Sequence, residues 1–108
     1  MNPGMHEVEL LDLQGTVAAP ELGRMCGLSV DNVFELLEYG LLTPVTTSAE
    51  GPVFSAACIE PLRQAASLRT RFDLDVFVVG LLFSHIERSV VLERRVRALE
   101  AQLPRPLP

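Results

Sequence analysis

Two opposite helix signals lie only two positions apart, at Gly27 and Ser29. Glycine readily takes the left-handed conformation that ends a helix, and a serine hydroxyl can cap the first N–H groups of the next one. Pro20 suits the first turn of a helix that ends at Cys26, because its missing N–H needs no partner there. Gly40 ends the second helix. The sequence therefore predicts two short helices joined by a tight turn, a helix-turn-helix.

The second of these helices is amphipathic. Its apolar residues recur at spacings of three and four and predict one buried face, made of Val30, Val33, Phe34, Leu37 and Leu41. Polar residues fall largely on the opposite side, namely Asp31, Asn32, Glu35 and Glu38. We expect the helix to pack its apolar side on a core and to turn its acidic side outward.

The segments around this pair carry weaker signals. Residues 1–14 suggest a tail or a short strand, and residues 42–54 predict a loop or a two-stranded wing, because they combine prolines, a glycine and β-branched residues. Ser55 can cap a third helix that runs to about Phe72. Pro61 removes a hydrogen bond inside such a helix, so we expect a kink or a helix that begins near Pro61.

A long helix is predicted for the last third of the chain. Either Asp73 or Asp75 can cap it, and it runs to about Leu103, before the proline-rich tail of residues 104–108 forbids continuation. Residues 76–83 are apolar on every side. A helix of this kind requires cover on every side.

The second half of the long helix carries a coiled-coil pattern. Apolar residues step by four, three and four through Leu92, Val96, Leu99 and Leu103. One short seam needs a partner helix in water, so the sequence predicts a homodimer. The expected interface consists of Leu82, Ile86, Leu92, Val96, Leu99 and Leu103.

Length and charge restrict the classes of function. The chain has 108 residues, enough for one core, and a formal net charge of -5 with two cysteines. We expect a domain at 15–72 followed by the helix at 73–103. No apolar run approaches the roughly 20 residues of a bilayer span, and so few cysteines favour a reducing, cytoplasmic location.

Several stretches of the chain resemble the MerR-like winged-helix family, and within it the chaperone modulator CbpM family. The resemblance covers roughly residues 15–103. It is found in ELGRMCGLS at 21–29, ELLEYGLLTP at 35–44, Phe54 and Ser55, SLRTRFDL at 67–74 and IERSVVLERRVRALEAQL at 86–103. The step from SLRTRFDL into a hydrophobic long helix is the most specific part.

This resemblance implies a mainly α fold, a MerR-like winged helix-turn-helix with a long C-terminal dimerisation helix. It also implies a bacterial chaperone modulator that binds the J-domain of a DnaJ/CbpA-like co-chaperone and inhibits its co-chaperone activity. The alternatives are a MerR-like DNA-binding transcriptional regulator and a structural adaptor for another protein.

Charge discriminates between the first two hypotheses. MerR-type regulators clamp DNA phosphates with basic residues of the second helix and the wing, yet no positive charge lies between Arg24 and Arg63. The same interval holds five carboxylates, which oppose binding to DNA. An acidic helix suits the basic helix of a J-domain. The candidate partner-binding residues are Asp31, Asn32, Glu35, Glu38 and Tyr39, and the competing interpretation of the acidic ones is a solvated helix face.

The sequence gives little evidence for a metal site or an active site. Cys26 and Cys58 lack further ligands at suitable spacing and are expected to be small buried hydrophobes, so we predict no metal site. His85 is expected at the surface, in the core or as a polar position in the seam. The chain shows no phosphate loop, nucleophile elbow or acid–base pair, so we predict no cofactor and no enzymatic activity.

Overall fold

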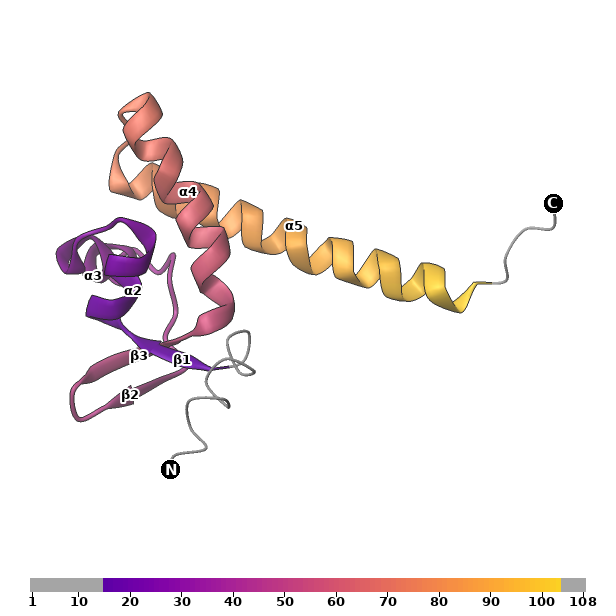
Figure 1. The fold of residues 1–108 in the computed structure, drawn as a ribbon, viewed down its shortest axis with the longest axis horizontal. Helices are drawn as coiled ribbons and strands as arrows, with labels where there is room; N and C mark the ends of the chain where they lie inside the picture. The colour runs from indigo at the N-terminus through magenta and orange to yellow at the C-terminus, as the bar shows by residue number, and fades with distance from the viewer. Residues whose placement is uncertain (1–14, 104–108) are drawn as a thin grey trace.

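The computed structural model describes residues 15–103, which form a mostly helical fold with a small three-stranded sheet (Figure 1). The expected tails at 1–14 and 104–108 lie outside the described residues. The elements in chain order are β1 (Thr16–Ala18), α2 (Ala19–Cys26), α3 (Val30–Glu38), β2 (Thr46–Ser48), β3 (Gly51–Ser55), the 3-10 turn η1 (Ala56–Cys58), α4 (Ile59–Phe72) and α5 (Val76–Gln102).

The turn between α2 and α3 follows the sequence signals. Gly27 has a φ of 79° and ends α2, and Ser29 caps α3. The Ser29 hydroxyl accepts from the backbone N–H of Asn32 at 3.0 Å, while the Asn32 side-chain oxygen accepts from the backbone N–H of Ser29 at 3.2 Å. This reciprocal capping satisfies two N–H groups that a helix start leaves open. The predicted pair of helices is confirmed.

The sheet has the order β1-β3-β2, and both pairs are antiparallel. The β2–β3 hairpin confirms the two-stranded interpretation of residues 42–54. In β1, Val17 lies opposite Phe54, whose side chain is fully buried. β1 was not predicted, because a strand of three residues is too short to show the alternation of apolar and polar side chains.

Single residues set the ends of the last two helices. Pro61 occupies the first turn of α4, where its missing N–H needs no partner, so the helix does begin near Pro61. Ser55 caps η1 instead of α4. Asp73, with a φ of 54°, ends α4, and the carboxylate of Asp75 accepts from the backbone N–H of Phe77 to cap α5.

The core lies between α2, α3, α4, β3 and the first half of α5. Its largest fully buried side chains are Phe54, Leu22, Leu36, Leu62, Val33 and Val79. The predicted face of α3 was partly wrong, since Leu36 is buried while Val30 and Phe34 are exposed. Two adjacent stripes of a helix can both show spacings of three and four. The positions of α2 and α5 against α3 select the stripe that is buried.

Only the first half of α5 packs on this body; the second half extends away from it (Figure 1). Val76, Val79 and Phe83 belong to the core, whereas every residue from 91 to 103 is exposed. Among residues 15–103, no helix is long and apolar enough to span a membrane.

Candidate partner-binding surface

The outer side of α3 carries three exposed carboxylates, Asp31, Glu35 and Glu38, which we call the acidic face. The two ion pairs found in residues 15–103 lie elsewhere, between Arg24 and Glu21 and between Arg63 and Glu60. The three carboxylates are spaced by four and three positions and therefore lie on one side of the helix. Among residues 15–103, no arginine forms an ion pair with these three carboxylates.

Asn32 differs from its acidic neighbours, because its side chain holds the fold together. The residue is half-buried, and Nη1 of Arg69 donates to its Oδ1 at 2.9 Å. Its Nδ2 donates to Oε1 of Glu35 at 3.2 Å. Asn32 therefore links α4 to α3 and orients Glu35 rather than pointing toward solvent.

Tyr39 lies at the end of α3 and contacts Phe77, near the start of α5. The two rings meet edge to face with centroids 5.1 Å apart. Leu81 follows Phe77 by one helical turn and lies on the same side of α5. All three side chains are well exposed, at 49% for Tyr39, 41% for Phe77 and 48% for Leu81. We call these three residues the apolar edge.

The apolar edge was only partly foreseen. Tyr39 was a predicted contact, but Phe77 and Leu81 were not, and the expected cover around residues 76–83 is absent on this side of α5 in the described chain. The available signal was the all-round apolar run itself, because a small body cannot cover every side of a helix that packs at its edge.

Gly80 explains how α5 approaches α3 so closely. A Cβ atom at this position would lie 2.5 Å from Cδ1 of Leu41 and 2.7 Å from Cδ2 of Leu36. These distances are far shorter than ordinary contacts between carbon atoms. The missing side chain lets the start of α5 lie beside the end of α3, where Tyr39 and Phe77 meet.

The predicted dimer residues fall into two groups. Leu82 and Ile86 are half-buried and pack against the core of their own chain. Leu92, Val96, Leu99 and Leu103 are between 51% and 65% exposed. Leu92 follows Ile86 by six residues, which places the two side chains about 120° apart around the helix axis. They therefore do not lie on the same side of α5. The exposed four are the available part of the expected interface.

Burial lowers the reactivity of both cysteines. It raises the pKa of Cys26 to about 11 and that of Cys58 to about 12. The Cys26 thiol donates to the backbone oxygen of Ile59 at 3.6 Å. Both residues fit the expected role of small buried hydrophobes. Residues 15–103 contain no group of three side chains suited to hold a metal ion.

The carboxylate of Glu87 lies beside a partly apolar pocket. Glu87 lines a pocket of about 160 Å³ with Thr43, Cys58 and Phe83 among its neighbours. Burial raises the pKa of the Glu87 carboxyl above its ordinary value of 4.5. Its charged form is therefore less favourable in the folded chain than in water.

Comparisons of the chain with protein-family models, with curated proteins and with solved structures gave no match. The functional assignment therefore depends on the residues and the geometry described above.

Proposed function

We propose that this protein is a chaperone modulator that binds the J-domain of a DnaJ/CbpA-like co-chaperone and inhibits its co-chaperone activity. In this proposal residues 15–72 form a MerR-like winged helix-turn-helix, with α2 and α3 as the helix pair and β2–β3 as the wing. The protein acts as a cytoplasmic homodimer through the second half of α5. The proposal rests on the resemblance to the CbpM family together with the chemistry of α3.

The observation that carries the proposal is the acidic face on α3, bordered by the apolar edge. Asp31, Glu35 and Glu38 are exposed on a helix held rigidly by its cap and by Arg69. Opposite charge speeds the encounter with a basic helix and selects against other partners. The exposed ring of Tyr39 provides the kind of large side chain that anchors protein interfaces.

The order of elements also favours a second candidate, a MerR-like regulator that binds DNA. Helix, tight turn, helix and hairpin follow one another as in proteins that insert the second helix into the major groove. Phosphate contacts supply most of the nonspecific affinity for DNA. Neither α3 nor the β2–β3 hairpin carries an arginine or lysine that could make them. We therefore place this candidate second.

The modulator hypothesis is tested by ATP hydrolysis in a reconstituted system of DnaK and its J-domain co-chaperone. Added protein is expected to lower the stimulated rate toward the rate of DnaK alone. The control omits the co-chaperone, and there the protein leaves the basal rate unchanged. An undiminished stimulated rate at saturating protein would contradict the proposal.

A further inference from the structure

A groove of about 480 Å³ lies between the start of α4 and the middle of α5. Most of its lining surface is apolar, and it includes the buried Pro61 and the half-buried Ile86 and Val90. The complete lining consists of Ala57, Glu60, Pro61, Gln64, Ile86, Val90 and Arg94. An apolar groove with charged residues at hand is suited to bind a short amphipathic segment of a chain.

The chain that precedes Gly15 starts beside this groove. β1 and β3 are antiparallel, with Thr16 opposite Ser55, and the backbone N–H of Ala56 donates to the oxygen of Gly15 at 2.8 Å. Each step back along the first strand therefore matches one step forward along the second, toward Ala57 in the groove lining. In Figure 1, β1 begins beside the start of α4, on the side of the body from which α5 extends.

The sequence of residues 8–13 has the pattern that such a groove requires. In an extended segment, alternate side chains point to the same side, so Glu9, Leu11 and Leu13 share one side. Two leucines on that side can cover the apolar lining. The glutamate on the same side lies further from β1 and can meet a positive charge.

The length of the segment also fits the groove. The groove follows α5 from Ile86 to Arg94, over which the helix advances by about 12 Å. An extended stretch from Leu13 back to Glu9 spans about 13 Å. With Leu13 next to the start of α4, Glu9 therefore reaches the level of Arg94.

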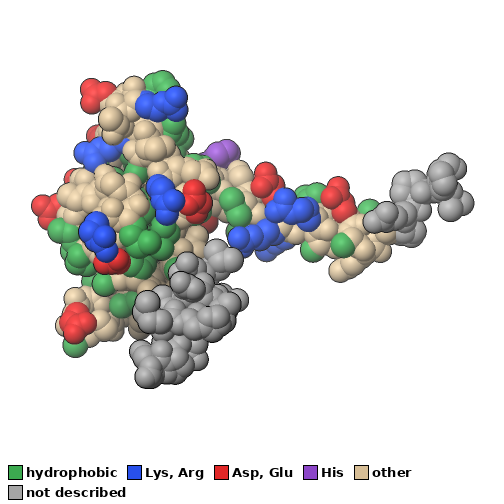
Figure 2. Space-filling view, in the orientation of Figure 1, with side chains coloured by type: hydrophobic (Ala, Val, Ile, Leu, Met, Phe, Trp, Pro, Cys, Tyr) green, Lys and Arg blue, Asp and Glu red, His purple; other side chains and the backbone are tan. Residues whose placement is uncertain are grey.

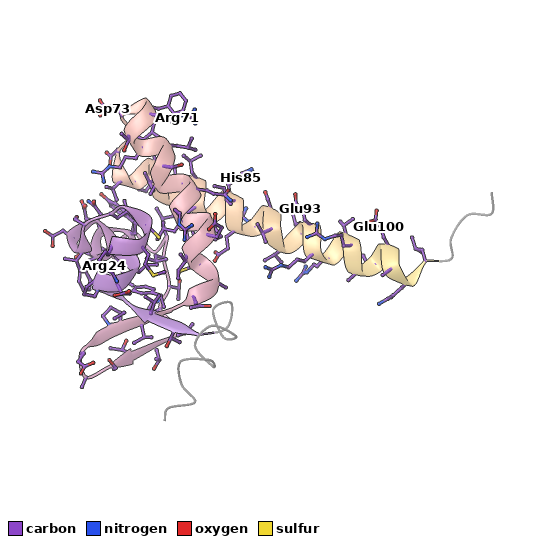
Figure 3. All side chains as sticks on the ribbon, in the orientation of Figure 1. Arg24, Arg71, Asp73, His85, Glu93 and Glu100 are labelled. Carbon is purple, nitrogen blue, oxygen red and sulfur yellow. The ribbon has the colours of Figure 1, made fainter. Side chains whose placement is uncertain are left out.

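Charge favours this placement of Glu9. Neither ion pair of residues 15–103 includes Arg94. Its own helix places no carboxylate beside it, since the positions three and four away are Val90, Val91, Arg97 and Ala98. Glu93 and Glu100 project from the side of α5 that is turned away from the sheet (Figure 3). Arginine side chains gather on the protruding half of this helix, where they attract a carboxylate (Figure 2).

We infer that residues 8–13 dock in the groove between α4 and α5 of the same chain. Leu11 and Leu13 cover the apolar lining, and Glu9 pairs with Arg94. Because the docked segment contacts both helices, it restrains the angle at which α5 leaves the body. The inference does not depend on J-domain binding, and its tests use this protein alone.

The first test is the oxidation of two introduced thiols in the full chain. Leu11→Cys with Val90→Cys places one thiol on the segment and one in the groove, so a disulfide within one chain is expected. The matched control, Leu11→Cys with Val91→Cys, turns the second thiol by about 100° around the helix. Its disulfide yield is expected to be lower by about tenfold, because disulfide geometry is restrictive. The native Cys26 and Cys58 are buried and are expected to stay reduced.

The second test uses fluorescence, because the sequence contains no tryptophan. Docking of Leu11→Trp is expected to shift the emission maximum to a shorter wavelength than that of the urea-unfolded chain. Adding Val90→Asp places a charge in the groove and should reverse the shift, whereas Val91→Asp is the control and should not. Arg94→Glu should also reverse the shift in part, and adding Glu9→Arg should restore it.

A disulfide within one chain in the Val90→Cys pair, together with an emission shift that Val90→Asp reverses, supports the docked segment. Mass spectrometry of the unreduced protein separates this product from a disulfide between two chains. A disulfide that joins two chains would overturn the inference, because the groove would then hold the segment of a second copy. Equal yields in the two thiol pairs, or an emission maximum equal to that of the unfolded chain, would also overturn it.

Discussion

The ring of Tyr39, at the end of α3, packs edge to face against the ring of Phe77, in the first turn of α5, with 83° between the ring planes. This contact joins the helix that carries the acidic face to the long helix α5, whose second half is exposed. Both rings remain partly open to solvent, so they can contribute to the fold and also meet a partner.

Removing one ring is expected to reveal both roles. Phe77→Ala loses the aromatic pair and should lower the free energy of unfolding by about 1 kcal/mol in urea denaturation. J-domain affinity should fall as well, because the apolar edge loses its middle residue. Phe72→Ala removes an exposed ring at the end of α4 and serves as the control, with smaller effects on both quantities. Equal effects of the two substitutions on J-domain affinity would argue against the apolar edge.

The acidic face predicts a charge-dependent interaction. Glu35→Lys combined with Glu38→Lys should weaken J-domain binding by at least about tenfold and reduce its dependence on salt, because attraction becomes repulsion. Calorimetry at two salt concentrations measures both. Glu50→Lys, on the turn of the β2–β3 hairpin, changes charge away from α3 and should bind as the wild type does. Unchanged affinity in the double variant would show that the partner binds elsewhere.

The tight contact at Gly80 predicts a steric effect. Alanine normally favours a helix over glycine by about 1 kcal/mol, but here its Cβ atom would collide with Leu36 and Leu41. We expect Gly80→Ala to lower the free energy of unfolding by about 1–3 kcal/mol in urea. Ser89→Ala, further along α5, is the control and should change stability little. A more stable Gly80→Ala variant would mean that α3 and α5 do not pack this closely.

Sequence patterns predicted the helix ends well, because each end depends on one or two residues with a local effect. Gly27, Ser29 and Asp75 all act where the pattern placed them. Local chemistry determines such positions before any tertiary contact forms. The mainly helical fold and the hairpin followed from the same kind of evidence.

Features that depend on distant residues could not be predicted in the same way. Leu36 is buried in place of Phe34 because α2 and α5 pack against one particular stripe of α3, and helical spacing alone does not determine which stripe that is. Tyr39 and Phe77 are separated by 38 positions, and their contact depends on the close approach at Gly80. The acidic side chains were recognised from sequence, whereas the apolar edge beside them required the fold.

Glu87 predicts a dependence of stability on pH. Its pKa is raised in the folded chain, so the folded state holds the proton more tightly and stability falls as pH rises above about 4.5 through the raised pKa. Glu87→Gln removes the partly desolvated charge and should unfold at a slightly higher urea concentration than wild type at pH 7. The difference should disappear below pH 4.5, where the carboxyl is protonated in both states. A variant less stable than wild type at pH 7 would contradict this assignment.

We propose that the acidic face on α3 binds a J-domain. The most direct test of this proposal is a calorimetric titration of the protein with the isolated J-domain of the co-chaperone from the same organism, at two salt concentrations, with duplex DNA as the control titrant. We expect saturable J-domain binding that weakens with salt, and no heat of binding from DNA. Salt-dependent binding of DNA without binding of the J-domain would contradict this proposal and favour a DNA-binding regulator. No binding of either titrant would also contradict it and would favour an adaptor for a different protein.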